Sequence, residues 1–258
     1  MRPTIVVSTR TSILTVATLV CAAATANAQG ERNLRDPGRM YREPAAVSAA
    51  AAPSFNLYLT PTYGWDDNSK SFGGQFKYSS DKQIAKHPFS ISASVSSLRF
   101  NAVAPASAVS KLATQLGAEM DLLSSAQYTL NMSAGMSRVE DIGTSIEIAP
   151  EFDWVLPKNS MVSGAIGAIY YWNRFSTMST PATPSVSNDG GTFGAIAYLN
   201  RGSWSVIPEY DFNSDYTGED TYSVKLSKSF KSFKHDPRVF FGFAKHDRFV
   251  AGGRWMLK

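Results

Sequence analysis

Cysteine is almost absent from this chain of 258 residues, because Cys21 is the only one. It lies in a leading segment that we expect to be removed, so we expect neither disulfides nor thiol chemistry in the mature protein. Charged residues are also scarce, at 18%, against about 25% in a typical soluble domain. After residue 28 no segment approaches the ~20 consecutive apolar residues of a membrane-spanning helix. These absences exclude a disulfide scaffold and a helical membrane protein.

The first 28 residues have the pattern of a secretory signal peptide. Arg2 and Arg10 supply a positive start, an apolar stretch runs from Thr11 to Ala24, and Ala26-Asn27-Ala28 forms a small-x-small cleavage site. The formal net charge is +4, and removal of both arginines leaves a nearly neutral chain. We therefore expect export and no binding of nucleic acid.

Residues 29–54 have no core-forming pattern. We interpret them as a flexible or partly helical periplasmic extension. A sharper hypothesis is contact with the cell wall or a partner through this segment. It mixes four arginines with three acids and ends in an alanine-rich run: Arg32, Arg35, Arg39 and Arg42, Glu31, Asp36 and Glu43, and Ala45–Ala52.

From Phe55 onward the chain alternates apolar and polar residues. In Leu112–Leu122 the even-numbered positions are apolar apart from a threonine, and the odd-numbered ones include Gln115, Glu119 and Asp121. Because successive side chains of a strand point to opposite faces, this predicts a strand with one apolar and one polar face.

The alternation recurs in about twelve segments of about ten residues, the length of a tilted membrane strand. It predicts an all-β protein, an antiparallel up-and-down transmembrane β-barrel over residues 55–258, with 10–14 strands as the range. The predicted strands are Phe55–Trp65, Ser71–Ser79, Pro88–Ser97, Leu112–Leu122, Gln127–Arg138, Thr144–Val155, Met161–Asn173, Thr192–Asn200, Ser203–Phe212, Thr221–Phe230, Val239–Lys245 and Arg248–Leu257.

Connection lengths agree with a barrel whose first strand starts from the periplasm. Barrels of this kind have short periplasmic turns and longer external loops. The two longest connections, Leu98–Lys111 and Arg174–Gly191, both fall outside on this numbering. Ser80–His87 and Lys231–Arg238 are exceptions, because they are long and fall on the periplasmic side.

Aromatic residues cluster where the predicted strands end. This is typical of the girdles that flank a membrane barrel, although a β-sandwich core also places aromatics at every second residue. The cluster comprises Trp65, Trp154, Tyr170, Tyr171, Trp172, Trp204, Tyr210, Phe212, Phe249 and Trp255.

One short pattern occurs three times, in Leu59–Trp65, Ile148–Trp154 and Val206–Phe212. Each copy has a proline on the apolar face, two and four residues before aromatics on that face. Proline lacks a ladder N–H, so it predicts a bulge or a locally loosened strand pair. The alternatives are acidic pairs held on a lumen wall and an architecture derived from duplicated hairpins. On the strand count, the middle copy runs opposite to the others.

The last strand, with Gly252-Gly253-Arg254-Trp255-Met256-Leu257, resembles the Gly-x-x-aromatic-x-apolar assembly signal of Gram-negative outer-membrane β-barrel proteins. Val250 and the terminal Lys258 depart from that signal. Together with the strand pattern, the chain resembles a small porin-like barrel of this class. The resemblance implies the bacterial cell outer membrane as location. It implies membrane lipid, lipopolysaccharide and the barrel assembly machinery as partners.

Catalytic and metal-binding patterns are weak, so we expect no enzyme, no cofactor and no metal. Lys234-His235-Asp236 and Lys245-His246-Asp247 suggest acid–base pairs. However, the strand between them separates the two by roughly 36 Å, at opposite rims. Turn residues are the plainer interpretation.

The charged residues that face the predicted lumen are the functional candidates, because opposed charges in a narrow bore set ion selectivity. We predict passive diffusion of small polar or charged solutes, favoured by small lumen residues such as Ser92 and Gly135. The alternatives are a structural or adhesion barrel with a closed lumen, and a soluble periplasmic β-domain. The candidates are Glu119, Asp121, Glu147, Glu151, Asp153, Glu209, Asp211, Lys77, Lys225 and Arg254.

Overall fold

The computed structural model describes residues 55–84, 87–101, 108–157, 162–179, 184–212, 219–230, 232–233, 235–245 and 247–257. The expected signal peptide and the extension 29–54 lie outside these residues. Within them no helix is long and apolar enough to cross a membrane. The strands are β1 Phe55–Trp65, β2 Ser69–Ile84, β3 His87–Phe100, β4 Val109–Ser124, β5 Tyr128–Val139, β6 Gly143–Val155, β7 Ser163–Thr177, β8 Ser187–Arg201, β9 Trp204–Phe212, β10 Thr221–Ser229, β11 Arg238–Ala244 and β12 Arg248–Met256.

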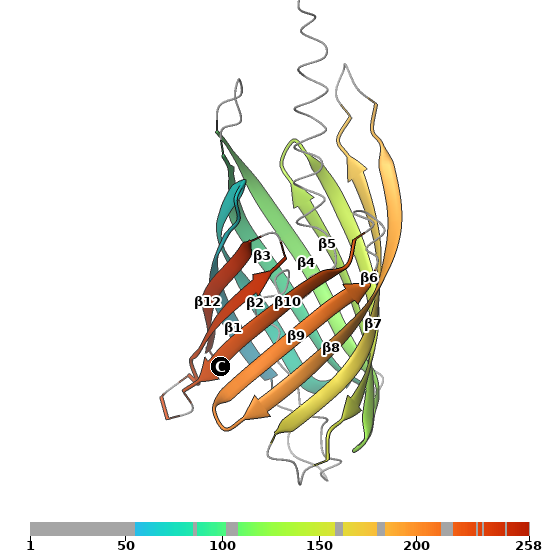
Figure 1. Ribbon diagram of the computed structural model, residues 1–258, viewed down its shortest axis with the longest axis vertical. Coiled ribbons are helices and arrows are strands. Elements are labelled where there is room, and N and C mark those ends of the chain that lie inside the picture. Colours follow the sequence, from blue (N-terminus) through green and yellow to red (C-terminus); the bar gives the residue numbers. More distant parts are fainter. Residues whose placement is uncertain are drawn as a thin grey trace, which may run out of the picture.

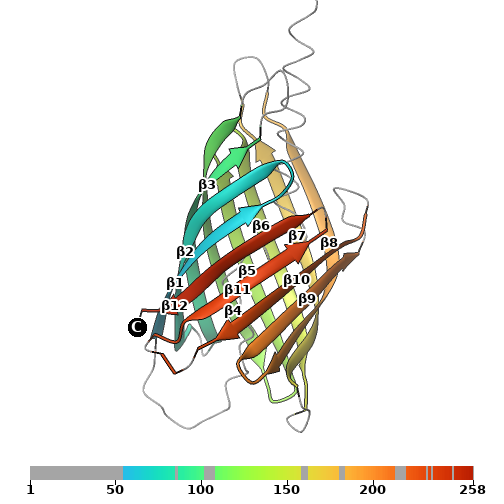
Figure 2. The same cartoon turned by 60° about the vertical axis from the view of Figure 1, so that its left-hand side comes forward.

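These strands form one closed antiparallel barrel, in which each pairs with its neighbours in sequence and β1 pairs with β12. Figure 1 shows the strands running obliquely around the barrel, and Figure 2 shows β1 and β12 side by side where it closes. Closure pairs the backbone of the edge strands, which would otherwise expose N–H and C=O groups. The predicted fold class and strand number are confirmed.

Alternation along most strands separates an apolar outer face from a polar inner face, whereas β11 also places Phe240 and Ala244 inside. On β10, Tyr222 and Leu226 are 45% and 42% exposed, whereas Lys225 between them is fully buried. The outer surface carries exposed Phe, Trp, Ile and Leu side chains on every side of the barrel, among them Phe72, Leu116 and Trp154. An apolar outer belt of this kind matches the lipid-facing surface of a membrane barrel.

A bulge in β4 corrects the predicted alternation. Asp121 pairs with Asn131, but Leu123 pairs with Leu130, so Leu122 is an extra residue on this strand. A bulge shifts the side-chain phase by one position. The outer face therefore passes to Leu123, which is 49% exposed, and the expectation that Leu122 continues the outer face was wrong.

Strands β2, β3, β4, β7 and β8 are longer than predicted, and this changes two connections. β2 extends to Ile84 and β3 begins at His87, so the expected long turn Ser80–His87 is mostly strand. Half of the expected loop Arg174–Gly191 is also strand, because β7 and β8 pair as far as Ser176 and Ser187. Figure 1 shows this hairpin projecting from one end of the barrel, with the β8–β9 turn and the C-terminus at the other end.

Most of the clustered aromatics point outward, which excludes the sandwich core. Trp154 and Trp204 are 55% and 47% exposed, and Trp65 stacks on Phe249 of β12 with ring centroids 5.2 Å apart. Tyr171 was assigned to this girdle wrongly. It points inward and is 2% exposed, because it lies one residue out of phase with Tyr170.

Each repeated proline interrupts a strand ladder without shifting its register. In β6–β7, Ile148 pairs with Trp172 and Glu151 with Ile169, and the two positions between them are unpaired. The same gap occurs beside Pro61 between β1 and β12 and beside Pro208 between β8 and β9. The sequence predicted either a bulge or a locally loosened strand pair at each proline. The structure has the loosened pair at all three sites and no bulge at any of them.

Candidate functional site

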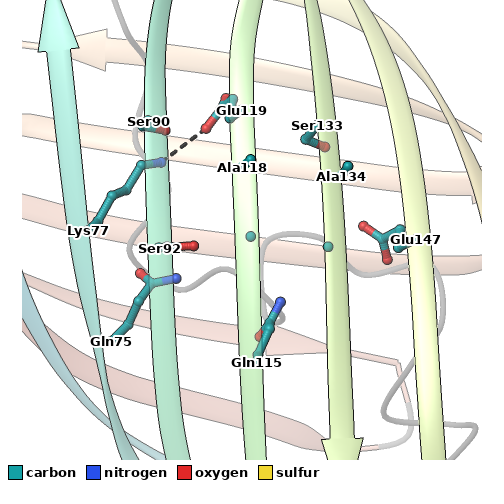
Figure 3. Close-up of a pocket in the computed structure, with 12 residues that line it drawn as sticks. Gln75, Lys77, Ser90, Ser92, Gln115, Ala118, Glu119, Ser133, Ala134 and Glu147 are labelled. Carbon is teal, nitrogen blue, oxygen red and sulfur yellow. Dashed lines mark hydrogen bonds and ion pairs between the residues drawn. The ribbon is translucent and has the colours of Figure 1, made fainter.

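A pocket lies on the inner surface, along β2–β6. On β2–β6 the inward positions are mostly serine, glycine and glutamine, which are too short to fill a barrel of this width. They border a half-open pocket, and about 530 Å³ of empty space lies there, including open solvent at its mouth. Figure 3 shows the polar side chains that face it, and the lining residues are Gln75, Lys77, Ser90, Ser92, Gln115, Gly117, Ala118, Glu119, Ser133, Ala134, Gly135 and Glu147.

An ion pair crosses this pocket wall. Lys77 of β2 lies 3.0 Å from a carboxylate oxygen of Glu119 on β4, and both side chains are largely shielded. Figure 3 shows the lysine reaching across β3, where Ser90 and Ser92 are short enough to let it pass. Glu147 enters the same pocket from β6. The pocket therefore presents both charges beside neutral amides and hydroxyls.

The adjoining wall, which continues from β6 to β10, is packed. Four of its acids are almost inaccessible: Glu151 is 1% exposed, Asp153 7%, Glu209 2% and Asp211 0%. Ile169 and Ile196 are buried beside them. Buried charges need hydrogen bonds or opposite charges around them, and this wall supplies several.

Two tyrosines hold the glutamates, each from two strands away. Tyr198 of β8 donates a hydrogen bond to Glu151 of β6, with 2.6 Å between the oxygens. Tyr171 of β7 donates to Glu209 of β9, which also accepts from Ser223. Each bond skips one strand, so the four strands β6–β9 are tied together by side chains as well as by their ladders.

This arrangement has an approximate local two-fold symmetry. Residues 163–174 of β7 and 190–201 of β8 share Gly-Ala-Ile, a tyrosine, and an Asn-Arg end at matching positions. The β6 and β9 copies of the proline pattern flank them. Through the ladders, Glu151 aligns with Asp211, and Asp153 aligns with Glu209. The copy of the proline pattern on β6 does run opposite to the copy on β9, as predicted, and this antiparallel relation produces the two-fold symmetry.

Glycines let the aspartates lie against the neighbouring strand. A Cβ on Gly167 would lie 2.1 Å from Oδ1 of Asp153, and a Cβ on Gly194 would lie 2.5 Å from Oδ1 of Asp211. A Cβ at either position would force the aspartate carboxylate to shift. The repeated Gly-Ala-Ile was the sequence signal for this cluster, and our sequence analysis missed it together with Tyr171 and Tyr198.

The structure thus groups most of the predicted lumen residues in two places. Lys77, Glu119 and Glu147 border the pocket. Lys225 belongs to the packed wall, where its register neighbours are Ile207 and Gly242.

Of the two other candidates, Asp121 lies between the groups, because its register partner Asn131 pairs in turn with Glu151. Asp121 accepts a hydrogen bond from Asn131, 2.8 Å long. Arg254 lies near the barrel seam, with its guanidinium 4.6 Å from the ring centre of Tyr58.

Histidines and metal ligands do not converge in the part of the chain that the structure describes. There, no group of three or more His, Cys, Asp or Glu residues could hold a metal ion. His235, Asp236 and Asp247 adopt positive φ angles of 73°, 38° and 51°, as expected of turn residues. His246 lies outside the described residues.

No protein-family model and no curated protein matches this sequence. Solved structures with the same fold do exist. The translocator domain of the autotransporter NalP from Neisseria meningitidis is 12% identical, with a TM-score of 0.59, covering 93% of this chain and 98% of its own. An outer membrane channel from Pseudomonas putida F1 is 9% identical with a TM-score of 0.58, covering 84% of this chain and 100% of its own.

The KdgM porin in complex with disordered oligogalacturonate is 12% identical, with a TM-score of 0.51, covering 78% of this chain and 99% of that structure. At such identities the likeness concerns the fold alone. This chain has the fold of outer-membrane β-barrels.

Proposed function

We propose that this protein is a channel of the bacterial outer membrane through which small polar or charged solutes diffuse passively, without catalysis. The observation that carries the proposal is the half-open pocket, with about 530 Å³ of empty space including its mouth, beside a charged and hydroxyl-lined wall, inside a barrel with an apolar outer face. Short inward side chains leave space for a hydrated solute, and the Lys77–Glu119 pair presents both signs of charge to it.

The outer face supports the proposed location. Its exposed aromatics and aliphatics suit contact with lipid, and its partners would be membrane lipid and lipopolysaccharide. The C-terminal strand suits recognition by the barrel assembly machinery. A Cβ on Gly252 would lie 2.4 Å from the carbonyl oxygen of Pro61, so this glycine of the signal is also required for closing the barrel.

A structural or adhesion barrel with a closed lumen is the second candidate. The packing of β6–β10 favours it, because the side chains of that wall are almost fully buried. A barrel filled by its side chains conducts no ions, whereas a wider one leaves a channel. The two candidates therefore differ in one measurable property.

Single-channel recording in planar lipid bilayers tests the proposal. The folded barrel, verified by its heat-sensitive gel mobility, should give discrete conductance steps. Verified folded protein that inserts and carries no current would support the closed barrel. Extraction from cells without detergent would contradict both candidates and favour a soluble periplasmic β-domain.

A further inference from the structure

Cationic and anionic side chains occupy different parts of the inner surface. The inner carboxylates named above lie on β4, β6 and β9. The inner faces of β10, β11, β12 and β1, all within the described residues, carry no carboxylate and four cations: Lys225, Arg238, Arg248 and Arg254. The bore therefore presents positive charge around the seam of the barrel, where β12 meets β1.

Two of these arginines are register partners. Arg238 begins β11 and pairs with Arg254 of β12. Both side chains point inward, in phase with the buried Phe240 and Val250. Like charges that lie directly opposite each other on one face of a sheet repel. An anion bound between the two guanidinium groups would remove that repulsion.

Arg238 has a donor that no described residue satisfies. Its Nε is buried and makes no hydrogen bond in this part of the chain. Asp236 acts on Arg238 electrostatically, but none of the ion pairs between described residues joins the two. A buried charged donor without an acceptor is destabilising. An oxyanion on this guanidinium would supply the missing acceptor.

Tyr58 of β1 lies beside both arginines. The guanidinium of Arg254 lies over its ring, 4.6 Å from the ring centre, and Tyr58 also acts electrostatically on Arg238. Stacking of this kind uses the flat face of a guanidinium, whereas its N–H groups point outward from the edge. The ring therefore fixes the plane of Arg254 in an orientation suited to binding an anion.

The arginine pair adjoins the pocket. Tyr58 is the register partner of Lys77, which lines the pocket. Arg238, Arg254 and Lys77 thus form a cationic strip over β11, β12, β1 and β2, which are neighbours in the sheet and lie side by side in Figure 2. Arg238 and Arg254 lie at the end of the barrel where β1 begins and β12 ends. The strip therefore leads from that end to the pocket.

We propose that Arg238, Arg254 and Tyr58 form a binding site for the phosphate or carboxylate group of a small anionic solute, next to the pocket wall. Guanidinium groups suit both ligands, because they donate two parallel hydrogen bonds to a pair of oxygens. The carboxylates Glu151 and Glu209 are out of reach of such a solute, because they are buried in the packed wall. The site gives the bore a preference for anions. Its role in permeation rests on the proposed channel function, whereas the binding itself does not.

Equilibrium dialysis of inorganic phosphate against the folded full-length barrel in detergent tests the site without requiring current. The wild type should bind phosphate saturably, and R238Q and R254Q should each weaken that binding about ten-fold or more. The control R99Q removes an exposed arginine of β3 and should bind as the wild type does.

Heat-sensitive gel mobility verifies that each of these proteins is folded. If one variant fails to fold, the other variant and the wild type decide. No saturable binding by the wild type, or the same affinity in all the folded proteins, would overturn the site.

Reversal potentials in planar bilayers test the consequence for permeation. Under a potassium chloride gradient the wild type should prefer anions, and R238Q/R254Q should shift the reversal potential toward cation preference. R99Q should leave it unchanged. Cation preference in the wild type, or no shift in the double variant, would contradict the role in permeation even where phosphate binds. If the folded protein carries no current, the channel proposal fails, and dialysis alone decides the site.

Discussion

The two walls of the lumen are built on the same ladders and the same alternation, yet one leaves a pocket and the other is packed. On β2–β5 the inward residues are short, so Lys77 can cross β3 to reach Glu119. On β6–β9 tyrosine, isoleucine and glutamate fill the same positions, and the acids become almost inaccessible. Side-chain volume at alternate positions, and not strand geometry, decides where a bore of this width is open.

The largest expected effect comes from adding volume to a glycine on the packed wall, with a glycine on the pocket wall as the control. Gly167→Val should destabilise the barrel by about 1–3 kcal/mol, because even its Cβ would lie 2.1 Å from Asp153 Oδ1 and 2.9 Å from the Phe152 carbonyl oxygen. Gly135→Val on the pocket wall should cost less than about 0.5 kcal/mol, since the nearest atom to its Cβ is 3.5 Å away.

Urea unfolding in detergent, followed by gel mobility, measures both glycine variants. Equal midpoints for the two would contradict the difference in packing between the walls.

Removing one phenolic hydroxyl should have the next largest effect. Tyr198→Phe leaves Glu151 without the hydrogen bond that this hydroxyl donates at 2.6 Å, and we expect a loss of about 1–3 kcal/mol. Tyr128→Phe is the control, because that ring packs against Phe152 on the outer side. A loss for the control as large as for Tyr198→Phe would show that the hydroxyl bond is unimportant.

Neutralising a carboxylate should change ion selectivity on the pocket wall and not on the packed wall. Glu119→Gln removes the negative partner of Lys77 beside the open pocket, so the reversal potential should shift toward anion preference. Glu151→Gln, at a position 1% exposed, should lower stability and leave the reversal potential unchanged, because its side chain does not face open space. If bilayer recordings showed a shift for Glu151→Gln and none for Glu119→Gln, the ions would pass along the packed wall and not along the pocket wall.

The smallest effect is expected at the rim. Lys245 lies 2.8 Å from Glu219 in an exposed ion pair, so Lys245→Ala should change stability by less than about 1 kcal/mol. Added salt should remove most of that change. A salt-insensitive loss in urea unfolding would mean that the pair is more shielded than its exposure indicates.

The alternation was sufficient to predict the closed barrel, because a period of two reports which face of a strand is apolar. It also placed Glu151, Asp153, Glu209 and Asp211 on the inner face. Strand ends were predicted less well: β7 and β8 continue into a stretch rich in Ser and Thr, where pairing with the neighbouring strand decides the structure and composition does not.

The division of the lumen into two walls could not be predicted from the pattern alone. Whether Glu151 and Glu119 meet open space or packed neighbours depends on side chains that reach them from two strands away, Tyr198 for Glu151 and Lys77 for Glu119. The repeated Gly-Ala-Ile of β7 and β8 was visible in the sequence. Its role could be recognised only from the strand register, which pairs Gly167 with Asp153 and Gly194 with Asp211.

The local two-fold symmetry gives this barrel an internal replicate. Tyr171→Phe and Tyr198→Phe, or Gly167→Val and Gly194→Val, are the same experiment performed twice on one molecule, at sites with the same chemistry and different positions along the wall. Agreement within a pair would measure the interaction itself. Disagreement would measure what the rest of the barrel adds at each site, which no substitution at a unique position can separate.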